Sequence, residues 1–226
     1  NVEPVQLNVK EGSKPYACFS CRPTPIHYRE TGEKLVQDLL DQRIIQRCGD
    51  SRSEYCAPAH FVEKPGRVPL ALRLVVDFTK LNDQLIRDQP QVFPTGEEIR
   101  QQLGADCCVW ICMDALAAYF QIKVRKEDRP KTTFMLHSGR YFFRKTVMGN
   151  RLSSDTWLRA SDKVIEGLDG VYKLVDDLII GGKDYAQLAE RLEALLKRCR
   201  KAGMTLASNK VQVGSRVNFA SYVIDG

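Results

Sequence analysis

Residues 174–180 read Leu-Val-Asp-Asp-Leu-Ile-Ile, so two adjacent carboxylates, Asp176 and Asp177, interrupt an otherwise apolar run. The flanking stretches 171–175 and 178–180 have the composition of buried strands. Aspartate is disfavoured in strands, and neighbouring carboxylates that face one way raise each other's pKa. We therefore predict a hairpin with both aspartates at its bend. Aspartate is also a common turn residue, which is a plain structural explanation when this hairpin is considered alone.

A third carboxylate, Asp114, follows another apolar stretch, residues 107–113. Gly104 precedes this stretch, whose nearly continuous hydrophobicity predicts a strand buried on both faces. A charge at the end of such a strand is costly unless it is paired or bound to a metal. An aspartate that only caps the strand or the following turn is the alternative. Two acidic sites, each at the edge of an apolar strand, indicate a common functional site. If the strands are neighbours, the carboxylates lie close together.

Metal-assisted phosphoryl transfer is the chemistry that needs such a cluster. Mg²⁺ prefers oxygen ligands and takes a few carboxylates together with substrate phosphates. Two ions about 4 Å apart can clamp an in-line displacement, one at the attacking oxygen and one at the leaving oxygen. The sequence therefore predicts that Asp114, Asp176 and Asp177 hold metal ions.

Cationic and aromatic residues fit the same chemistry. Lys64 lies at the tip of a predicted hairpin between residues 59–63 and 70–78, and Arg73 lies in its second strand. Both residue types suit phosphate contact. Tyr119 follows shortly after the first aspartate and could stack on a sugar or a base. Taken alone, Lys64 and Arg73 are better explained as ordinary surface charges, and a core tyrosine explains Tyr119 equally well.

The rest of the chain mixes helix and strand patterns without regular alternation, which predicts an α+β sheet with helices mainly on one face. The candidate helix caps are Thr31, Thr95 in a capping box with Glu98, Ser153 or Ser154, and Asp184. The helix after Asp184 is expected to end at Gly203 and to place on one face Leu188, Leu192, Leu195, Leu196 and Cys199. Further strands are expected at 132–136 and 140–147, and a last hairpin at 211–213 and 217–224.

Length and composition allow one large domain or two small subdomains with a shared core. The 226 residues carry a formal net charge of +6, a mild basic excess that is compatible with a polyanionic partner. No apolar run approaches the roughly 18 residues of a membrane span, and the N-terminus does not read as a secretory signal.

Cys18 and Cys21 form a C-x-x-C without a second pair at zinc-site spacing. We therefore expect free thiols in a reducing compartment.

Several motifs taken together resemble a known family. Residues 73–82 read Arg-Leu-Val-Val-Asp-Phe-Thr-Lys-Leu-Asn, and residues 113–122 read Met-Asp-Ala-Leu-Ala-Ala-Tyr-Phe-Gln-Ile. Leu-Val-Asp-Asp at 174–177, a helix pattern at 185–202, Leu206, Asn209-Lys210 and residues 219–224 then follow in order. Over nearly the whole chain, this order and spacing resemble the reverse transcriptases of gypsy-type LTR retrotransposons and, more distantly, of retroviruses.

The resemblance implies a polymerase fold of the α+β class. Its palm, an antiparallel sheet backed by helices, would comprise residues 89–121 and 151–226, and an inserted fingers subdomain would comprise residues 1–88 and 122–150. The family's thumb would be absent, because the chain stops where it should begin. The implied enzyme is a nucleotidyltransferase, an RNA-directed DNA polymerase that extends a primer on an RNA or DNA template.

The resemblance also implies roles for individual residues. The three aspartates would hold two Mg²⁺ ions, or Mn²⁺ in their place, near the Ala115 carbonyl. Lys64 and Arg73 would contact the triphosphate of the incoming nucleotide, and Tyr119 would be the steric gate against a ribose 2′-hydroxyl. The nucleotide pocket would also be lined by Met148 and Gly149. A hairpin that grips the primer end would contain Phe219, Ala220, Ser221 and Tyr222.

The implied partners are an RNA or DNA template-primer, deoxynucleoside triphosphates and the other domains of a Pol polyprotein, namely thumb, RNase H and integrase, with no membrane. The implied location is intracellular, in the cytoplasm or a virus-like particle. The chain departs from the family pattern at Leu174, Val147-Met148, Ser154 and Ala220-Ser221.

None of these departures removes an aspartate, which favours an active enzyme. A catalytically idle relative that binds nucleic acid or a protein partner remains an alternative. So does an unrelated metal-dependent phosphotransferase, which would need no template.

Overall fold

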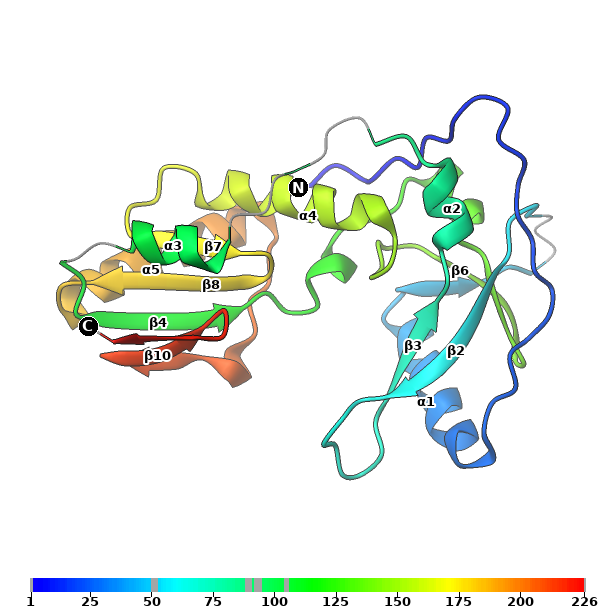
Figure 1. Ribbon diagram of the computed structural model, residues 1–226, viewed down its shortest axis with the longest axis horizontal. Helices are drawn as coiled ribbons and strands as arrows, with labels where there is room; N and C mark the ends of the chain where they lie inside the picture. The colour runs from blue at the N-terminus through cyan, green and yellow to red at the C-terminus, as the bar shows by residue number, and fades with distance from the viewer. Residues whose placement is uncertain (1, 50–52, 88–90, 92–94, 104–105, 226) are drawn as a thin grey trace. The chain divides into compact units, whose positions relative to one another are not determined.

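The computed structural model describes residues 2–49, 53–87, 91, 95–103 and 106–225, and they form an α+β fold (Figure 1). The chain divides into two compact units. Unit 1 comprises Asn1–Glu3, Gln89–Gln121 and Ser154–Gly226, and unit 2 comprises Pro4–Asp88 and Ile122–Ser153. From Pro4 onward the chain therefore passes from unit 2 to unit 1, returns to unit 2, and ends in unit 1.

Unit 2 is built on a five-stranded sheet with the order β1-β6-β5-β2-β3. The strands are β1 (Ile45–Arg47), β2 (Ala57–Glu63), β3 (Leu72–Val76), β5 (Phe134–Leu136) and β6 (Gly139–Phe143). The pair β2–β5 is parallel and the other pairs are antiparallel. Its helices are α1 (Arg29–Asp41) and α2 (Thr79–Gln84), with 3₁₀ turns η1 (Ile26–Tyr28) and η3 (Lys126–Thr132). The rings of Phe134, Tyr141 and Phe143 pack together in its core.

The predicted hairpin around Lys64 is confirmed as the antiparallel pair β2–β3. Two other expectations in unit 2 are wrong. Thr31 lies inside α1 and does not cap it, because η1 leads directly into the helix from Tyr28. The strand expected at 140–147 ends at Phe143, and beyond it only Lys145 forms an isolated bridge, to Lys123.

Unit 1 is built on a four-stranded antiparallel sheet with the order β7-β8-β4-β9 (Figure 1). The strands are β4 (Val109–Asp114), β7 (Val171–Leu174), β8 (Asp177–Gly182) and β9 (Gln212–Gly214). A separate hairpin consists of β10 (Arg216–Phe219) and β11 (Tyr222–Asp225). Every residue of β4 before Asp114 is buried, which confirms the prediction of a strand covered on both faces.

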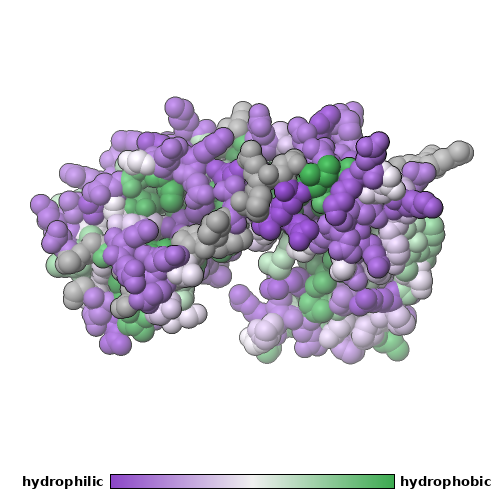
Figure 2. All heavy atoms as spheres, turned by 45° about the horizontal axis from the view of Figure 1, so that its top comes forward, coloured by the Kyte–Doolittle hydropathy of each residue, from purple (hydrophilic) through white to green (hydrophobic). Residues whose placement is uncertain are grey.

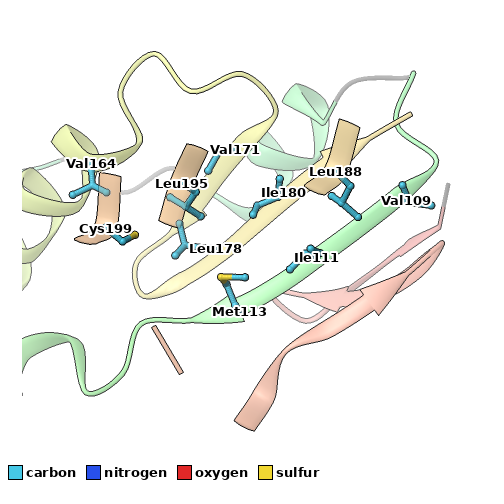
Figure 3. Packing of buried hydrophobic residues seen from close by; sticks show 10 residues of the cluster. All are labelled: Val109, Ile111, Met113, Val164, Val171, Leu178, Ile180, Leu188, Leu195 and Cys199. Carbon is cyan, nitrogen blue, oxygen red and sulfur yellow. The ribbon is translucent and has the colours of Figure 1, made fainter. Parts of the chain in front are cut away.

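Alternation along β4 and β8 supplies two hydrophobic layers, one on each face of the sheet. On one face, Val109, Ile111 and Met113 pack with residues of α4 (Arg151–Ile165) and α5 (Tyr185–Ala202), as Figure 3 shows. On the other face, Trp110 and Cys112 pack with α3 (Gly96–Gln102) and the β10–β11 hairpin. The two long helices thus back one face, as expected, while a short helix and a hairpin cover the other.

Two of the four predicted caps are confirmed and a third is displaced. Thr95 forms a capping box with Glu98, and the Asp184 side chain accepts a hydrogen bond from the Gln187 backbone N–H at 2.8 Å. Ser153 and Ser154 lie inside α4, which begins earlier, at Arg151. Asn150 precedes α4, and its Oδ1 accepts from the backbone N–H of Leu152 at 3.0 Å.

The end of the chain also differs from its prediction. Helix α5 ends at a left-handed Gly203, as expected, but Leu196 is 46% exposed and does not belong to the buried face. Residues 212–214 form β9, which pairs with β4, so the last hairpin is β10–β11 alone. Gly104, which precedes the apolar stretch 107–113, lies outside the described residues.

Hydrophilic side chains predominate on the face shown in Figure 2, and hydrophobic ones form small separate groups there. Within the described residues, no helix has both the length and the apolar character that crossing a membrane requires. All eight cysteines are free.

Candidate active site

The register of the unit 1 sheet brings Asp114 opposite Asp177. Asp114 ends β4 and Asp177 begins β8, and their Cα atoms are partners in the antiparallel pair. Asp114 continues the alternation of Trp110 and Cys112, so both aspartates project from the face that α3 and the β10–β11 hairpin cover. Side chains directly opposite each other in such a pair have Cβ atoms about 5 Å apart. Two carboxylates that are 63 positions apart in the chain numbering therefore converge.

Asp176 lies in the two-residue turn between β7 and β8. The other turn residue, Val175, has a φ of 57°. A β-branched residue rarely adopts this left-handed conformation, which destabilises the folded state by on the order of 1–3 kcal/mol. The Asp176 carbonyl accepts a hydrogen bond from the Ala115 N–H at 2.8 Å. The backbone of the turn is thus tied to the residue that follows Asp114.

The aspartates share an excess of negative charge. Burial, a hydrogen bond with Asp114 and the charges of Asp176 and Asp114 raise the pKa of Asp177 from 3.8 to about 6. Lys210, from the 3₁₀ turn η4 (Ser208–Lys210), opposes this rise, and its Nζ lies 3.0 Å from Asp114 Oδ2. Lys210 can balance at most one of the three negative charges, so the cluster can accept further positive charge.

The carboxylate oxygens of these aspartates are suitable ligands for a hard divalent cation. Within the described part of the chain, no three Asp, Glu, His or Cys side chains surround one point closely enough to hold a metal ion. Asp114 and Asp177 converge, and Asp176 lies beside them in the turn. Carboxylate oxygens are the ligands that Mg²⁺ prefers.

The segment after Asp114 is fixed by Gln121, a contact that the sequence did not predict. The Gln121 Nε2 donates to the carbonyls of Leu116 at 2.7 Å and Thr205 at 2.8 Å, and its Oε1 accepts from the Thr205 N–H at 2.9 Å. Tyr119 lies within this segment, in the 3₁₀ turn η2 (Ala118–Gln121). Its hydroxyl lies 3.3 Å from the Ser154 Oγ of α4. The Ser154 side chain of α4 and the Thr205 backbone in the loop after α5 therefore hold the segment that contains Tyr119.

Four residues predicted to bind the nucleotide belong to unit 2. Lys64 follows β2 and is exposed, and Arg73 is an exposed residue of β3 opposite Val62. Met148 is 61% exposed, and Gly149 has a φ of 91°. The roles of these residues beside the aspartates stay predictions.

The predicted primer grip coincides with the β10–β11 hairpin. Phe219 is buried against the sheet of unit 1, whereas Tyr222 is exposed. Ala220 and Ser221 form the turn between the strands, with φ values of 51° and 68°. The contact of this hairpin with a primer stays a prediction.

A palm-like antiparallel sheet backed by two helices, with aspartates at the adjoining ends of β4 and β8, characterises a class of nucleic-acid polymerases. The chain matches the model of the reverse transcriptase (RNA-dependent DNA polymerase) family over residues 62–224 and belongs to that family.

The curated relatives are polyproteins. The chain is 32% identical to the retrovirus-related Pol polyprotein from transposon gypsy of Drosophila melanogaster, over 84% of this chain and 18% of the relative. It is 27% identical to that from transposon opus, over 89% and 20%. It is 24% identical to the enzymatic polyprotein of cauliflower mosaic virus, over 87% and 29%. The chain thus spans less than a third of each of these relatives.

Solved structures show the same fold. Prototype foamy virus protease-reverse transcriptase aligns with a TM-score of 0.84 over 97% of this chain and 29% of that chain, at 17% identity. The foamy viral enzyme in complex with an RNA/DNA hybrid aligns with a TM-score of 0.82 over 99% of this chain and 29% of that chain, at 16% identity. These likenesses, together with the family match, confirm the polymerase fold expected from the sequence.

Proposed function

We propose that this chain is the polymerase core of a reverse transcriptase and extends a primer on an RNA or DNA template. The observation that carries the proposal is the pairing of Asp114 with Asp177 across β4 and β8, with Asp176 in the adjoining turn, in a member of the reverse transcriptase family. The reaction is the attack of the primer 3′-hydroxyl on the α-phosphate of a deoxynucleoside triphosphate, with release of pyrophosphate.

Asp114, Asp176 and Asp177 would hold two Mg²⁺ ions, or Mn²⁺ in their place. When bound, such ions stabilise the attacking and the leaving oxygen of an in-line displacement. The raised pKa of Asp177 supports this assignment, because a carboxylate that resists ionisation among like charges gains from a nearby cation. The three aspartates would bind and orient these ions.

The other predicted residues would position the substrates. Tyr119, held by Ser154, would lie beneath the sugar as a steric gate, near the Ala115 backbone. Lys64 and Arg73 would contact the triphosphate, and Met148 and Gly149 would complete the pocket. The hairpin residues Phe219, Ala220, Ser221 and Tyr222 would grip the primer end.

Unit 1 would serve as the palm and unit 2 as the fingers. Contacts with the template-primer would go mainly to phosphates, so binding should weaken as salt rises. Because the chain matches only part of longer Pol polyproteins, we also propose that it works with their thumb, RNase H and integrase domains, inside the cell.

The decisive test is primer extension on an RNA template with Mg²⁺, with Asp176→Asn beside the wild type. The matched control is Asp38→Asn, which makes the same chemical change on the exposed side of α1. Template-directed incorporation that is lost in Asp176→Asn and kept in Asp38→Asn is the expected result. Binding of the template-primer without incorporation would instead indicate an idle relative, and incorporation without a template would indicate another phosphotransferase.

A further inference from the structure

The turn that carries Asp176 is held by a tryptophan of α4. The Trp157 indole Nε1–H donates to the Val175 carbonyl at 2.8 Å. Trp157 is only 2% exposed, so this donor has no access to competing water. Val175 is the turn residue with a φ of 57°. The helix therefore contacts the hairpin where its backbone is most strained.

A buried lysine supplies a second link between the same two elements. The Lys173 side chain, in β7, is 4% exposed. Its Nζ lies 2.6 Å from Ser161 Oγ, 2.7 Å from Asp162 Oδ1 and 3.3 Å from the Leu158 carbonyl. A buried ammonium is costly unless it is well paired, and here all three of these partners come from α4. Lys173 thus fixes β7 against α4 two residues before the turn.

The two links meet on one turn of α4. Ser161 accepts from Lys173 and donates to the Trp157 carbonyl at 2.7 Å. We name Trp157, Ser161, Asp162 and Lys173 the α4 clamp. It joins the helix to the hairpin at the turn and at the strand that leads into it.

The turn itself needs such support. Two-residue hairpin turns with positive φ favour glycine or asparagine, because other side chains are strained there. Valine offers no such relief, and strained conformations persist only where the surroundings hold them in place. Asp176 and Asp177 follow directly, so a relaxed turn would move both carboxylates.

We propose that Trp157 is a positioning residue for Asp176 and Asp177, and that Lys173 provides a second contact that fixes the same hairpin to α4. Its indole N–H holds the Val175 carbonyl so that the turn keeps the conformation that directs the two carboxylates. The consequence for catalysis rests on the proposed function, whereas the consequence for the turn does not.

Trp110 provides a matched control. It is the other tryptophan of the chain and is also 2% exposed. Within the described residues its Nε1 has no hydrogen-bond partner. Its ring packs against Gly181, where an added Cβ would lie 2.4 Å from the ring. The same change at both positions therefore removes a hydrogen bond only at Trp157.

The cleanest change replaces each tryptophan in turn by benzothienylalanine, which keeps the shape of the ring and lacks the N–H. Trp157→Phe and Trp110→Phe form a second pair. Amide hydrogen exchange of residues 174–177 is the direct measurement. We expect exchange there to rise at least about tenfold in both Trp157 variants and to stay at the wild-type rate in both Trp110 variants, because only Trp157 holds the turn.

Primer extension then tests the catalytic consequence. We expect the Trp157 variants to lower kcat roughly ten- to hundredfold, since small misplacements of catalytic groups have effects of this size. KM for the nucleotide should change little, because the lost contact does not bind substrate. Lys173→Met should act in the same direction.

The outcomes separate the two proposals. Equal exchange at residues 174–177 in the Trp157 and Trp110 variants would overturn the positioning role, whether or not the wild type is active. Raised exchange in the Trp157 variants with an inactive wild type would keep the clamp and reject the polymerase. Raised exchange with unchanged kcat would overturn the link between turn and catalysis.

Discussion

Unit 1 contains two hairpins with strained two-residue turns, and they are held in different ways. In β7–β8, Val175 has a positive φ, and both turn carbonyls accept hydrogen bonds, from Trp157 and from Ala115. In β10–β11, Ala220 and Ser221 both have positive φ, and Ser221 is exposed. Hydrogen bonds from Trp157 and Ala115 hold the backbone of the first turn, which contains Asp176 and directly precedes Asp177. In the second turn, the Ala220 side chain packs against the hydrophobic core of unit 1. The comparison suggests that strain is stabilised by neighbours where side-chain placement matters.

The largest expected effect comes from the first hairpin. Asp177→Asn should lower primer extension by at least about a thousandfold, because it removes one of the three carboxylates proposed to hold the metal ions. The fold should survive, since asparagine has nearly the same shape. Thermal unfolding followed by circular dichroism checks the fold, and Asp38→Asn serves as the control. Comparable turnover by the Asp177 variant would refute the proposed catalytic role of this aspartate.

If the proposed function holds, the segment that follows β4 should control the choice of sugar. Tyr119→Ala should raise the incorporation of ribonucleotides relative to deoxynucleotides on the order of a hundredfold, because the ring would no longer block a 2′-hydroxyl. Ser154→Ala should have a smaller effect in the same direction, since it removes one contact of the Tyr119 hydroxyl but keeps the ring. Competition between paired nucleotides gives the ratio. An unchanged ratio in Tyr119→Ala would refute the steric gate.

A smaller effect should appear in the pH dependence of stability. The pKa of Asp177 is raised from 3.8 to about 6, so the folded state binds this proton more tightly than the unfolded state. The resulting stabilisation is complete below about pH 4 and is lost as the pH rises through about 6. Asp177→Asn should flatten this part of the melting-temperature profile relative to Asp38→Asn.

Lys210→Met sharpens the same test. Lys210 lowers the pKa of Asp177, so its loss should move the fall in stability to higher pH. Measuring melting temperatures from pH 4 to 8 in both variants checks the two directions. A shift to lower pH in Lys210→Met would contradict the arrangement of charges that the structure shows.

Local patterns in the sequence predicted much of this region. The apolar runs located β4 and β8, and their aspartates marked the ends that meet. Helix caps were predicted correctly where the side chain has a matching partner, as in Thr95 with Glu98. They were wrong at Thr31 and Ser153 or Ser154, since a hydroxyl residue within a helix has the same local pattern as a cap.

Contacts between distant segments were not predictable in this way. Lys210 reaches Asp114, Gln121 reaches Thr205, and Trp157 reaches Val175 only because strands and helices bring them together. A tryptophan in an amphipathic helix predicts burial but does not identify the acceptor of its N–H. Strand β9 was assigned to the wrong hairpin for a related reason, because a three-residue strand has no pattern that selects its neighbour.

The smallest expected effect comes from the second hairpin and completes the comparison. Ser221→Gly should stabilise the protein by up to about 1 kcal/mol, because glycine adopts the φ of 68° without steric cost. Val175→Gly relieves the same kind of strain but removes a side chain beside Asp176 and Asp177 and gives the turn more conformational freedom. We expect Ser221→Gly to keep its activity and Val175→Gly to lose some. Denaturant unfolding and primer extension measure the two changes. Equal activity in both variants would show that relieving the backbone strain has the same effect on activity at the two turns. The hydrogen bonds to the first turn would then contribute to stability alone.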